Sequence, residues 1–115
     1  MRVRKARQIL KALSDDTRLR VVGLLRKNEL TVTEICRALN RNQSIVSKHL
    51  TRMRLVGIVG DRRKGLNVYY RLLEPKDNIH QKLISVVGLC ISELNICKED
   101  MKNLRKFKRK KRSMS

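Results

Sequence analysis

Residues 42–65 combine a helical apolar stripe with a polar opposite face. Ile45, Val46, Leu50 and Met53 recur at the spacing of one helix face. The other positions carry hydroxyl groups, an amide, an imidazole and cations, which suit phosphate oxygens and base edges in a DNA major groove. One face of this helix is therefore expected to pack against a core, while the other face is available to contact a ligand.

Two helices are predicted near the start of the chain. Residues 2–13 place apolar side chains on one side and basic side chains largely on the other, as an amphipathic helix does. Ser14, Asp15 and Asp16 can cap a second helix, whose dipole favours acidic side chains at its start. That second helix is expected to continue to about Arg26.

A third helix and a tight turn lead into the polar-faced helix. Residues 34–39 form a short helix that Thr31 or Thr33 can cap. Residues 40–42 supply the turn, and the next helix is expected over 43–55. A short helix, a tight turn and a polar-faced second helix together predict a helix-turn-helix.

A β-hairpin is predicted directly after the helix-turn-helix. Residues 58–63 and 68–72 read as two short strands joined by a basic connection that contains glycine. A hairpin in this position is a wing. Its tip, at Arg62, Arg63 and Lys64, is placed to reach phosphate or an adjacent minor groove.

The pattern after Pro75 predicts one long helix over 76–104, about 45 Å in length at the standard helical rise. Residues 1–75 cannot cover a helix of that length, so its apolar stripe and the first helix are expected to form a homodimer interface. Seven of the eight residues at 105–112 are basic, and residues 105–115 are expected to be a disordered tail. The expected fold is mainly α with a small β-hairpin: a winged helix-turn-helix domain (1–75) followed by a long dimerisation helix.

The charge balance favours a polyanionic partner. The 115 residues include 29 Lys and Arg against 10 Asp and Glu, a formal net charge of +19. The excess is spread along the chain, so a basic tail alone does not account for it. Nucleic acid is the expected partner, and the scarcity of aromatic residues disfavours single-strand readers that stack bases.

Other features narrow the class of protein. Three cysteines without a CxxC pair fit a reducing cytoplasm better than a secreted disulfide framework. A DNA-binding protein in the cytoplasm is expected to associate with the nucleoid. No apolar run is long enough to cross a membrane, so no membrane partner is expected. The sequence has no phosphate-binding glycine loop and no evident catalytic cluster, so we expect a binding protein that needs no cofactor and not an enzyme.

Three stretches together resemble a known family. They are ILKALSDDTRLRVVGLL, ELTVTEICRALNRNQSIVSKHLTRMRLVGIV and DRRKGLNVYYRL. Their order and spacing are similar to those of winged helix-turn-helix transcription regulators of the arsenic-repressor (ArsR/SmtB) type. The similarity spans about residues 5–74, and its most specific parts are LSDDTRLR and the segment that starts at Gln43.

The resemblance implies a dimeric repressor that binds an inverted repeat in double-stranded DNA and releases it when an effector binds. The two recognition helices of such a dimer lie in successive major grooves about 34 Å apart. By position, the family's DNA contacts fall on these residues of the recognition helix and wing: Gln43, Ser44, Ser47, Lys48, His49, Arg52, Arg62, Arg63 and Lys64. His49 could instead pack against the wing.

The sequence departs from the family's metal chemistry. Thr31 and Thr33 stand where many relatives carry a CxC thiolate pair, and hydroxyl groups are poor ligands for soft metals. A second family site, on the last helix, is only weakly matched by Asp77, His80 and Glu93, with Cys90 nearby, so no metal is expected.

Two alternatives to a repressor with an unknown effector remain at this point. Cys36 could form a thiol or persulfide switch with Cys90 or Cys97 if the cysteines came together, although all three could simply pack as small apolar residues. The chain could also be an architectural or RNA-associated basic protein whose affinity comes mainly from residues 105–112. The effector itself, if there is one, is unknown.

Overall fold

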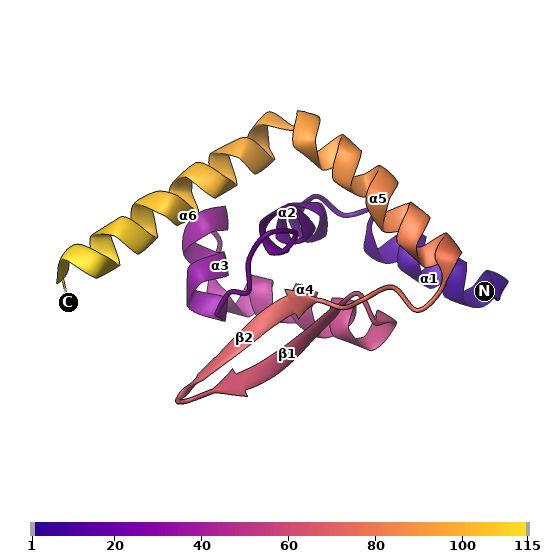
Figure 1. The fold of residues 1–115 in the computed structure, drawn as a ribbon, viewed down its shortest axis with the longest axis horizontal. Helices are drawn as coiled ribbons and strands as arrows, with labels where there is room; N and C mark the ends of the chain where they lie inside the picture. The colour runs from indigo at the N-terminus through magenta and orange to yellow at the C-terminus, as the bar shows by residue number, and fades with distance from the viewer. Residues whose placement is uncertain (1, 115) are drawn as a thin grey trace.

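The computed structural model describes residues 2–114 as a helical body with one β-hairpin (Figure 1). Within these residues the elements follow the order α1 (Val3–Ala12), α2 (Asp16–Leu25), α3 (Val32–Leu39), α4 (Gln43–Val56), β1 (Val59–Lys64), β2 (Asn67–Leu72), α5 (Asn78–Glu93) and α6 (Asn95–Met114). This is the predicted winged helix-turn-helix arrangement, and the fold class is therefore confirmed. None of the helices in the described part is both long and apolar enough to span a lipid bilayer.

Local side-chain caps explain where α2, α3 and α4 begin. The Asp15 carboxylate accepts a hydrogen bond from the backbone amide of Arg18 at 3.0 Å. Thr31 and Glu34 form a reciprocal capping box at the start of α3. Asn42 accepts from the amide of Ile45 at 2.9 Å and so caps α4. Each cap satisfies a backbone amide that the first helical turn leaves without a partner.

The corner between α3 and α4 depends on Asn40. This residue ends α3 in the left-handed conformation, with φ 53° and ψ 48°. Asparagine tolerates that region better than most residues because its short polar side chain can bond locally. The corner turns α4 away from α3, and the two helices form the predicted helix-turn-helix.

The hairpin is attached to the helical body through β2. The strands β1 and β2 pair antiparallel up to Lys64 and Asn67, and Gly65 occupies the tip with φ 64°. At the other end, Leu30 and Tyr70 exchange two backbone hydrogen bonds, of 3.0 and 2.7 Å. Most of the hairpin therefore projects into solvent while its base is fixed.

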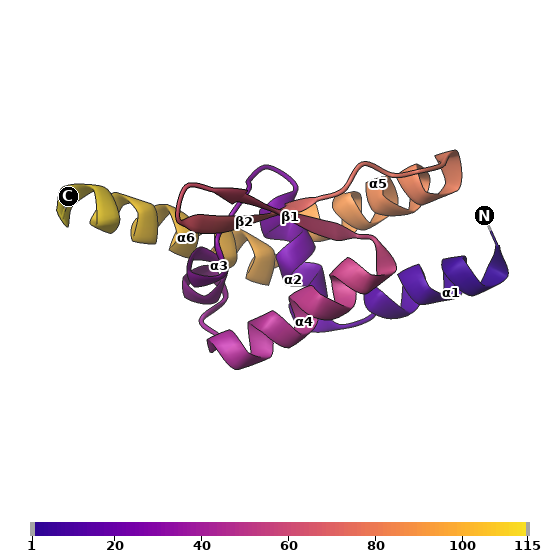
Figure 2. The same ribbon diagram turned by 90° about the horizontal axis from the view of Figure 1, so that it is seen from below.

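The core is aliphatic, as the shortage of aromatic residues predicts. Ile9, Leu24, Ile35, Leu50 and Met53 are all almost completely buried, and they come from α1, α2, α3 and α4. Figure 2 shows these helices gathered around α2. Packing of one apolar stripe from each helix is what gives α4 a fixed position on the body.

The prediction of a single helix over 76–104 with a disordered tail is wrong. The chain bends at Leu94, which has φ −82° and ψ 120°, and this break separates α5 from α6. The bend lays α6 over α2 and α3, where Cys97, Asp100 and Leu104 become buried. These contacts outweigh the uninterrupted helical pattern, and α6 then continues through residues 105–114, with Ser115 outside the described residues.

Apolar side chains remain exposed on α1 and α5. More than half of the surface is exposed at Val3 and Leu10 on α1 and at Ile79, Val86 and Leu89 on α5. Both helices lie toward the same end of the molecule in Figures 1 and 2. The α5 face extends the apolar surface that sequence analysis assigns to a homodimer.

Candidate nucleic-acid interface

The helix α4 presents a polar surface away from the core. Val46, Leu50 and Met53 are buried against the body. On the outside, Gln43, Ser44, Lys48, Thr51 and Arg52 are exposed, and Ser47 is half-buried. An α-helix fits a DNA major groove, which is about 12 Å wide. The outer face of α4 is therefore shaped and equipped to contact base edges and phosphates.

Ile45 does not belong to the buried stripe of α4. It is 40% exposed and, together with Leu55, lines an open groove of about 690 Å³ that runs along α4 and also borders Arg18 and His49. Helical spacing alone placed Ile45 with Val46 in the core. Their side chains point about 100° apart around the helix, and only Val46 faces the body.

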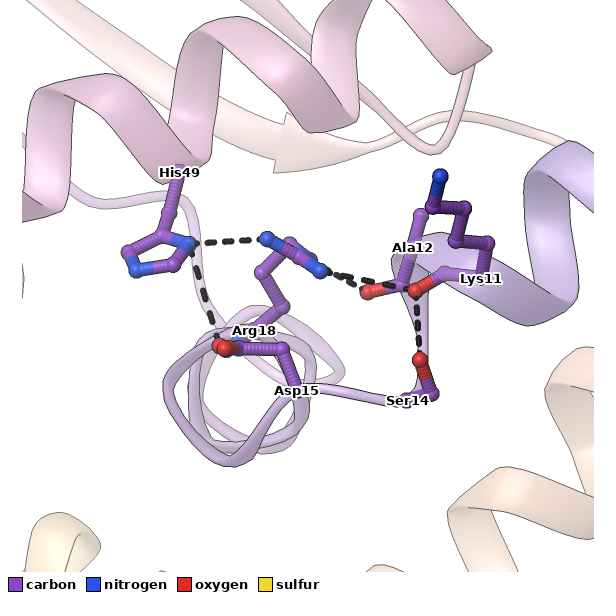
Figure 3. A network of polar contacts seen from close by, with 6 residues as sticks. All are labelled: Lys11, Ala12, Ser14, Asp15, Arg18 and His49. Atoms are coloured by element: carbon purple, nitrogen blue, oxygen red, sulfur yellow. Dashed lines mark hydrogen bonds and ion pairs between the residues drawn. The ribbon is translucent and has the colours of Figure 1, made fainter.

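Arg18 connects three elements beneath the recognition surface (Figure 3). Its Nε donates to the carbonyl oxygen of Ala12 at 2.5 Å, and its Nη2 donates to that of Lys11 at 3.4 Å. Its Nη1 lies 3.1 Å from Nδ1 of His49 on α4. Arg18 is only 7% exposed. Its buried guanidinium satisfies carbonyl groups at the end of α1 and contacts α4 from the side that faces the body.

His49 belongs to this internal network. Its Nδ1 lies 3.7 Å from Oδ2 of Asp15, on the side that faces α2 (Figure 3). Burial lowers the pKa of His49, the charges of Arg18 and Arg52 lower it further, and Asp15 only partly opposes them. The imidazole is therefore neutral at pH 7, and Nδ1 accepts the hydrogen bond from Arg18.

Asp15 stays ionised in the same network. Burial alone would raise the pKa of Asp15. The backbone amide of Arg18, the protonated form of His49 and the guanidinium of Arg18 act in the opposite direction and leave that pKa below its usual value. Asp15 therefore caps α2 as a carboxylate and adds a negative charge beside His49.

The wing carries its basic side chains unequally. Arg62 Nη2 forms an ion pair with Oε2 of Glu29 at 2.7 Å, which ties β1 to the segment before α3. Arg63 and Lys64 are exposed nearer the tip. Their position lets them extend beyond α4, whereas Arg62 has to leave or share Glu29 to reach a phosphate.

The three cysteines lie on different helices. Cys36 is half-buried on α3, Cys90 is exposed on α5, and Cys97 is buried on α6; all three are free thiols. Burial raises the pKa of the Cys36 thiol, and burial together with the charge of Asp100 raises that of Cys97. A raised pKa disfavours the reactive thiolate.

The weakly matched metal ligands have other surroundings. Asp77 caps α5 by accepting from the amide of His80 at 2.8 Å. His80 is buried, and Glu93 is exposed near the other end of α5. Across residues 2–114, no group of three or more His, Cys, Asp or Glu side chains is arranged to hold a metal ion.

Sequence reasoning missed Arg18 and Ile45 as parts of this region. The LSDDTRLR stretch pointed to the segment around Arg18, but nothing in its pattern indicates a buried guanidinium that contacts His49. That contact joins residues 31 positions apart in the chain. Only the packing of α1, α2 and α4 brings the partners together.

The fold and the exposed face of α4 define the class of protein: a winged helix-turn-helix DNA-binding protein. The family described as "Bacterial regulatory protein, arsR family" matches residues 15–60. The transcriptional repressor BigR from Xylella fastidiosa superposes with a TM-score of 0.68 at 30% identity, over 80% of this chain and 90% of that one. The chain belongs to the arsR family, and the predicted resemblance is confirmed.

Two further relatives extend the comparison. The arsenic resistance transcriptional regulator ArsR1 of Pseudomonas putida is 49% identical over 65 residues, or 56% of this chain. That match spans about half (51%) of the relative's length. A homodimeric winged helix-turn-helix domain from Mycobacterium bovis superposes with a TM-score of 0.66 at 27% identity, over 79% of this chain and 82% of that one.

Proposed function

We propose that this protein is a sequence-specific transcription repressor that binds double-stranded DNA as a homodimer. The observation that carries the proposal is the exposed polar face of α4, beside a basic wing, on a chain with a net charge of +19. Repression is supported by the similarity to BigR, which is itself a transcriptional repressor. Action on chromosomal DNA would place the protein in the cytoplasm, at the nucleoid.

The proposed DNA contacts divide by position. Gln43, Ser44, Ser47, Lys48 and Arg52 on α4 would contact base edges and nearby phosphates, because they line the outer face of the helix. Ile45 adds an apolar group that could meet a thymine methyl.

The other proposed contacts lie on the wing. Arg63 and Lys64 would contact phosphate or the adjacent minor groove, with Arg62 contributing when it is not held by Glu29. In this arrangement His49 positions α4 through Arg18 and does not contact DNA.

The homodimer would form through α1 and α5. Ile79, Val86 and Leu89 form an exposed apolar face on α5, and burial of apolar surface is the main driving force for association. The related domain from Mycobacterium bovis is homodimeric. A two-fold dimer would read an inverted repeat, with its recognition helices about one DNA turn, or roughly 34 Å, apart.

A test of sequence reading starts from a duplex that the full chain selects from a random library. Ser47→Ala and Arg52→Ala are then compared with Lys98→Ala, which removes an exposed cation at the start of α6, away from α4. Each α4 variant should lose about 1 to 3 kcal/mol of preference for the selected duplex over a scrambled one. Lys98→Ala should retain the full preference.

The rival hypothesis is an architectural or RNA-associated protein. It predicts that the α4 variants bind like the unmodified protein and that removal of residues 105–115 abolishes binding. Strong binding to RNA without preference for any duplex would likewise contradict the proposed repressor.

A further inference from the structure

The charge of α6 is concentrated in its C-terminal half. Seven of the eight residues at 105–112, which we call the basic segment, are Lys or Arg, and residues 101–115 contain no Asp or Glu. Most of these cations are exposed. Because the segment is helical, its charges lie along a rod rather than on a loose tail.

The helix that carries the basic segment is firmly anchored to the body. Asp100 is 1% exposed, and its carboxylate accepts a bidentate pair of hydrogen bonds from the guanidinium of Arg20 on α2, at 2.8 and 2.9 Å. Arg20 also donates to the carbonyl oxygen of Leu39 at 2.9 Å. Leu104, one turn beyond Asp100, is 2% exposed. These contacts fix α6 against α2 and α3.

Two more contacts continue this attachment along α3. Asn103 donates to the carbonyl oxygen of Ala38 at 3.1 Å. The guanidinium of Arg37 lies 5.6 Å from the ring centroid of Phe107, which is inside the basic segment. The helix α3 is the first helix of the helix-turn-helix, so the basic segment has a defined position relative to α4.

The direction of α6 carries the basic segment outward. In Figure 1, α6 descends from its junction with α5 and ends beyond α3, on the same side as the tip of the wing. The N-terminus, α1 and the first turns of α5 lie at the opposite end. In a dimer joined through α1 and α5, the two basic segments would therefore lie at the outer ends of the assembly.

The charge of the basic segment indicates that its partner is negatively charged. Like charges three or four residues apart repel one another and destabilise a helix. Within residues 105–112 there is no acidic residue to offset the repulsion, and the nearest carboxylates along α6, Glu99 and Asp100, lie before the segment. A row of phosphates at the outer end of a proposed DNA-binding surface would offset this repulsion.

We propose that residues 105–112 bind the phosphate backbone of duplex DNA outside the two half-sites read by α4 and the wing. This inference rests on the proposed function, because it uses the DNA that α4 holds to define where the flanks lie. Each half of the dimer would thus have three points of contact: α4, the wing and the basic segment. The segment lengthens the footprint without adding sequence preference, since phosphates carry no direct sequence information.

The test uses two duplexes that share one selected site. The first ends at the outer edges of the site, and the second adds 12 base pairs of arbitrary sequence on each side. The unmodified full chain should bind the longer duplex at least tenfold more tightly near 100 mM salt. Lys106→Gln, Arg109→Gln and Lys110→Gln, combined in one variant, should lose most of that gain while binding the short duplex normally.

A matched control separates position from net charge. Lys76→Gln, Lys98→Gln and Lys102→Gln remove the same number of exposed cations outside the basic segment. This control variant should keep the gain from the flanks. Hydroxyl-radical footprinting should show flank protection for the control and much weaker protection for the segment variant. Circular dichroism checks that both variants remain helical.

The outcomes distinguish this inference from the proposed function. Equal loss of the gain in both triple variants would overturn the inference, because net charge alone would then explain the effect. A selected site with no dependence on flank length would overturn it and leave the repressor proposal intact. Failure to select any site, or tighter binding of RNA than of the flanked duplex, would overturn both.

Discussion

The helices α5 and α6 follow each other in the chain but have opposite relations to the body. On α5, Val86 and Leu89 are more than half exposed. On α6, Asp100 and Leu104 are almost completely buried, while its last turns are basic. The difference separates two parts of the C-terminal region: α5 keeps an apolar surface exposed, which we propose as the dimer interface, and α6 packs on the helix-turn-helix and carries the basic charge.

The strongest expected effect concerns the attachment of α6. Asp100→Ala removes one partner of a buried ion pair and leaves Arg20, whose side chain is 11% exposed, without its carboxylate. Such a change costs about 3 to 5 kcal/mol of unfolding free energy. Urea unfolding at fixed protein concentration measures it.

A second ion pair provides the control for that substitution. Asp61 and Arg54 form a pair at 3.2 Å on the exposed surface, with side chains 33% and 50% exposed. Asp61→Ala should cost no more than about 1 kcal/mol. Equal costs for the two aspartates would contradict the view that α6 is anchored through Asp100.

The same substitution on each helix sharpens the comparison. Leu104→Ala should lower the unfolding free energy by about 2 to 5 kcal/mol at every protein concentration, because it creates a cavity. Leu89→Ala should leave the folded monomer within about 0.5 kcal/mol of the original, since Leu89 is 71% exposed. Its effect should appear as weaker dimerisation.

Sedimentation and urea unfolding at two protein concentrations measure these two effects. Leu66→Ala, at an exposed leucine near the tip of the wing, is the matched control and should change neither quantity. An unchanged dimer in Leu89→Ala, or a concentration-dependent effect in Leu104→Ala, would reverse the roles assigned to α5 and α6.

Local signals in the sequence were sufficient for the first four helices and the wing. The capping residues Thr31 and Asn42 and the left-handed Asn40 lie within a few residues of the backbone that they control. The bend at Leu94 could not be found in this way. It accompanies the packing of α6 on the body, which includes the pairing of Asp100 with Arg20, 80 residues apart, and only the assembled fold creates these contacts.

The candidate site was predictable only where it depends on residues close together in the chain. Helical periodicity identified the outer face of α4, because that face is a property of one helix. The inward direction of His49 depends on Arg18 and Asp15 from α2. The periodic pattern of one helix holds no information about contacts with another helix. It also placed the exposed Ile45 in the core.

A smaller effect is expected from pH. Burial lowers the pKa of His80 on α5, with a further contribution from Lys5 on α1 and partial opposition from Asp77. The unfolded chain then binds more protons than the folded chain below pH 6.5, so stability is complete above that pH and is lost as the pH falls through the lower folded pKa. His49 acts in the same direction.

Urea unfolding at pH 7.5 and pH 5.5 measures this loss. His80→Gln and His49→Gln should each reduce the difference between the two pH values, and the double variant should reduce it most. Greater stability at pH 5.5 than at pH 7.5 in the unmodified protein, with that gain removed by the substitutions, would mean that the sign is wrong.

The smallest expected effect is at the contact between α3 and the basic segment. Phe107→Leu keeps an apolar side chain but removes the ring beneath Arg37. Losing this cation–π contact should lower the stability of the attached end of α6 by about 0.5 to 1 kcal/mol. Hydrogen exchange of the last turns of α6 would report it as faster opening, and Phe107→Tyr, which keeps an aromatic ring, should restore slow exchange.

The most direct measurement of the central claim is the sequence of the duplexes that the full chain selects from a random library. A dimer with one α4 in each major groove predicts an enriched inverted repeat, with half-site centres about 10 to 10.5 base pairs apart. Two chains should be bound per duplex. Enrichment of no motif, or of a single half-site bound by one chain, would contradict the account of a dimeric, sequence-reading repressor.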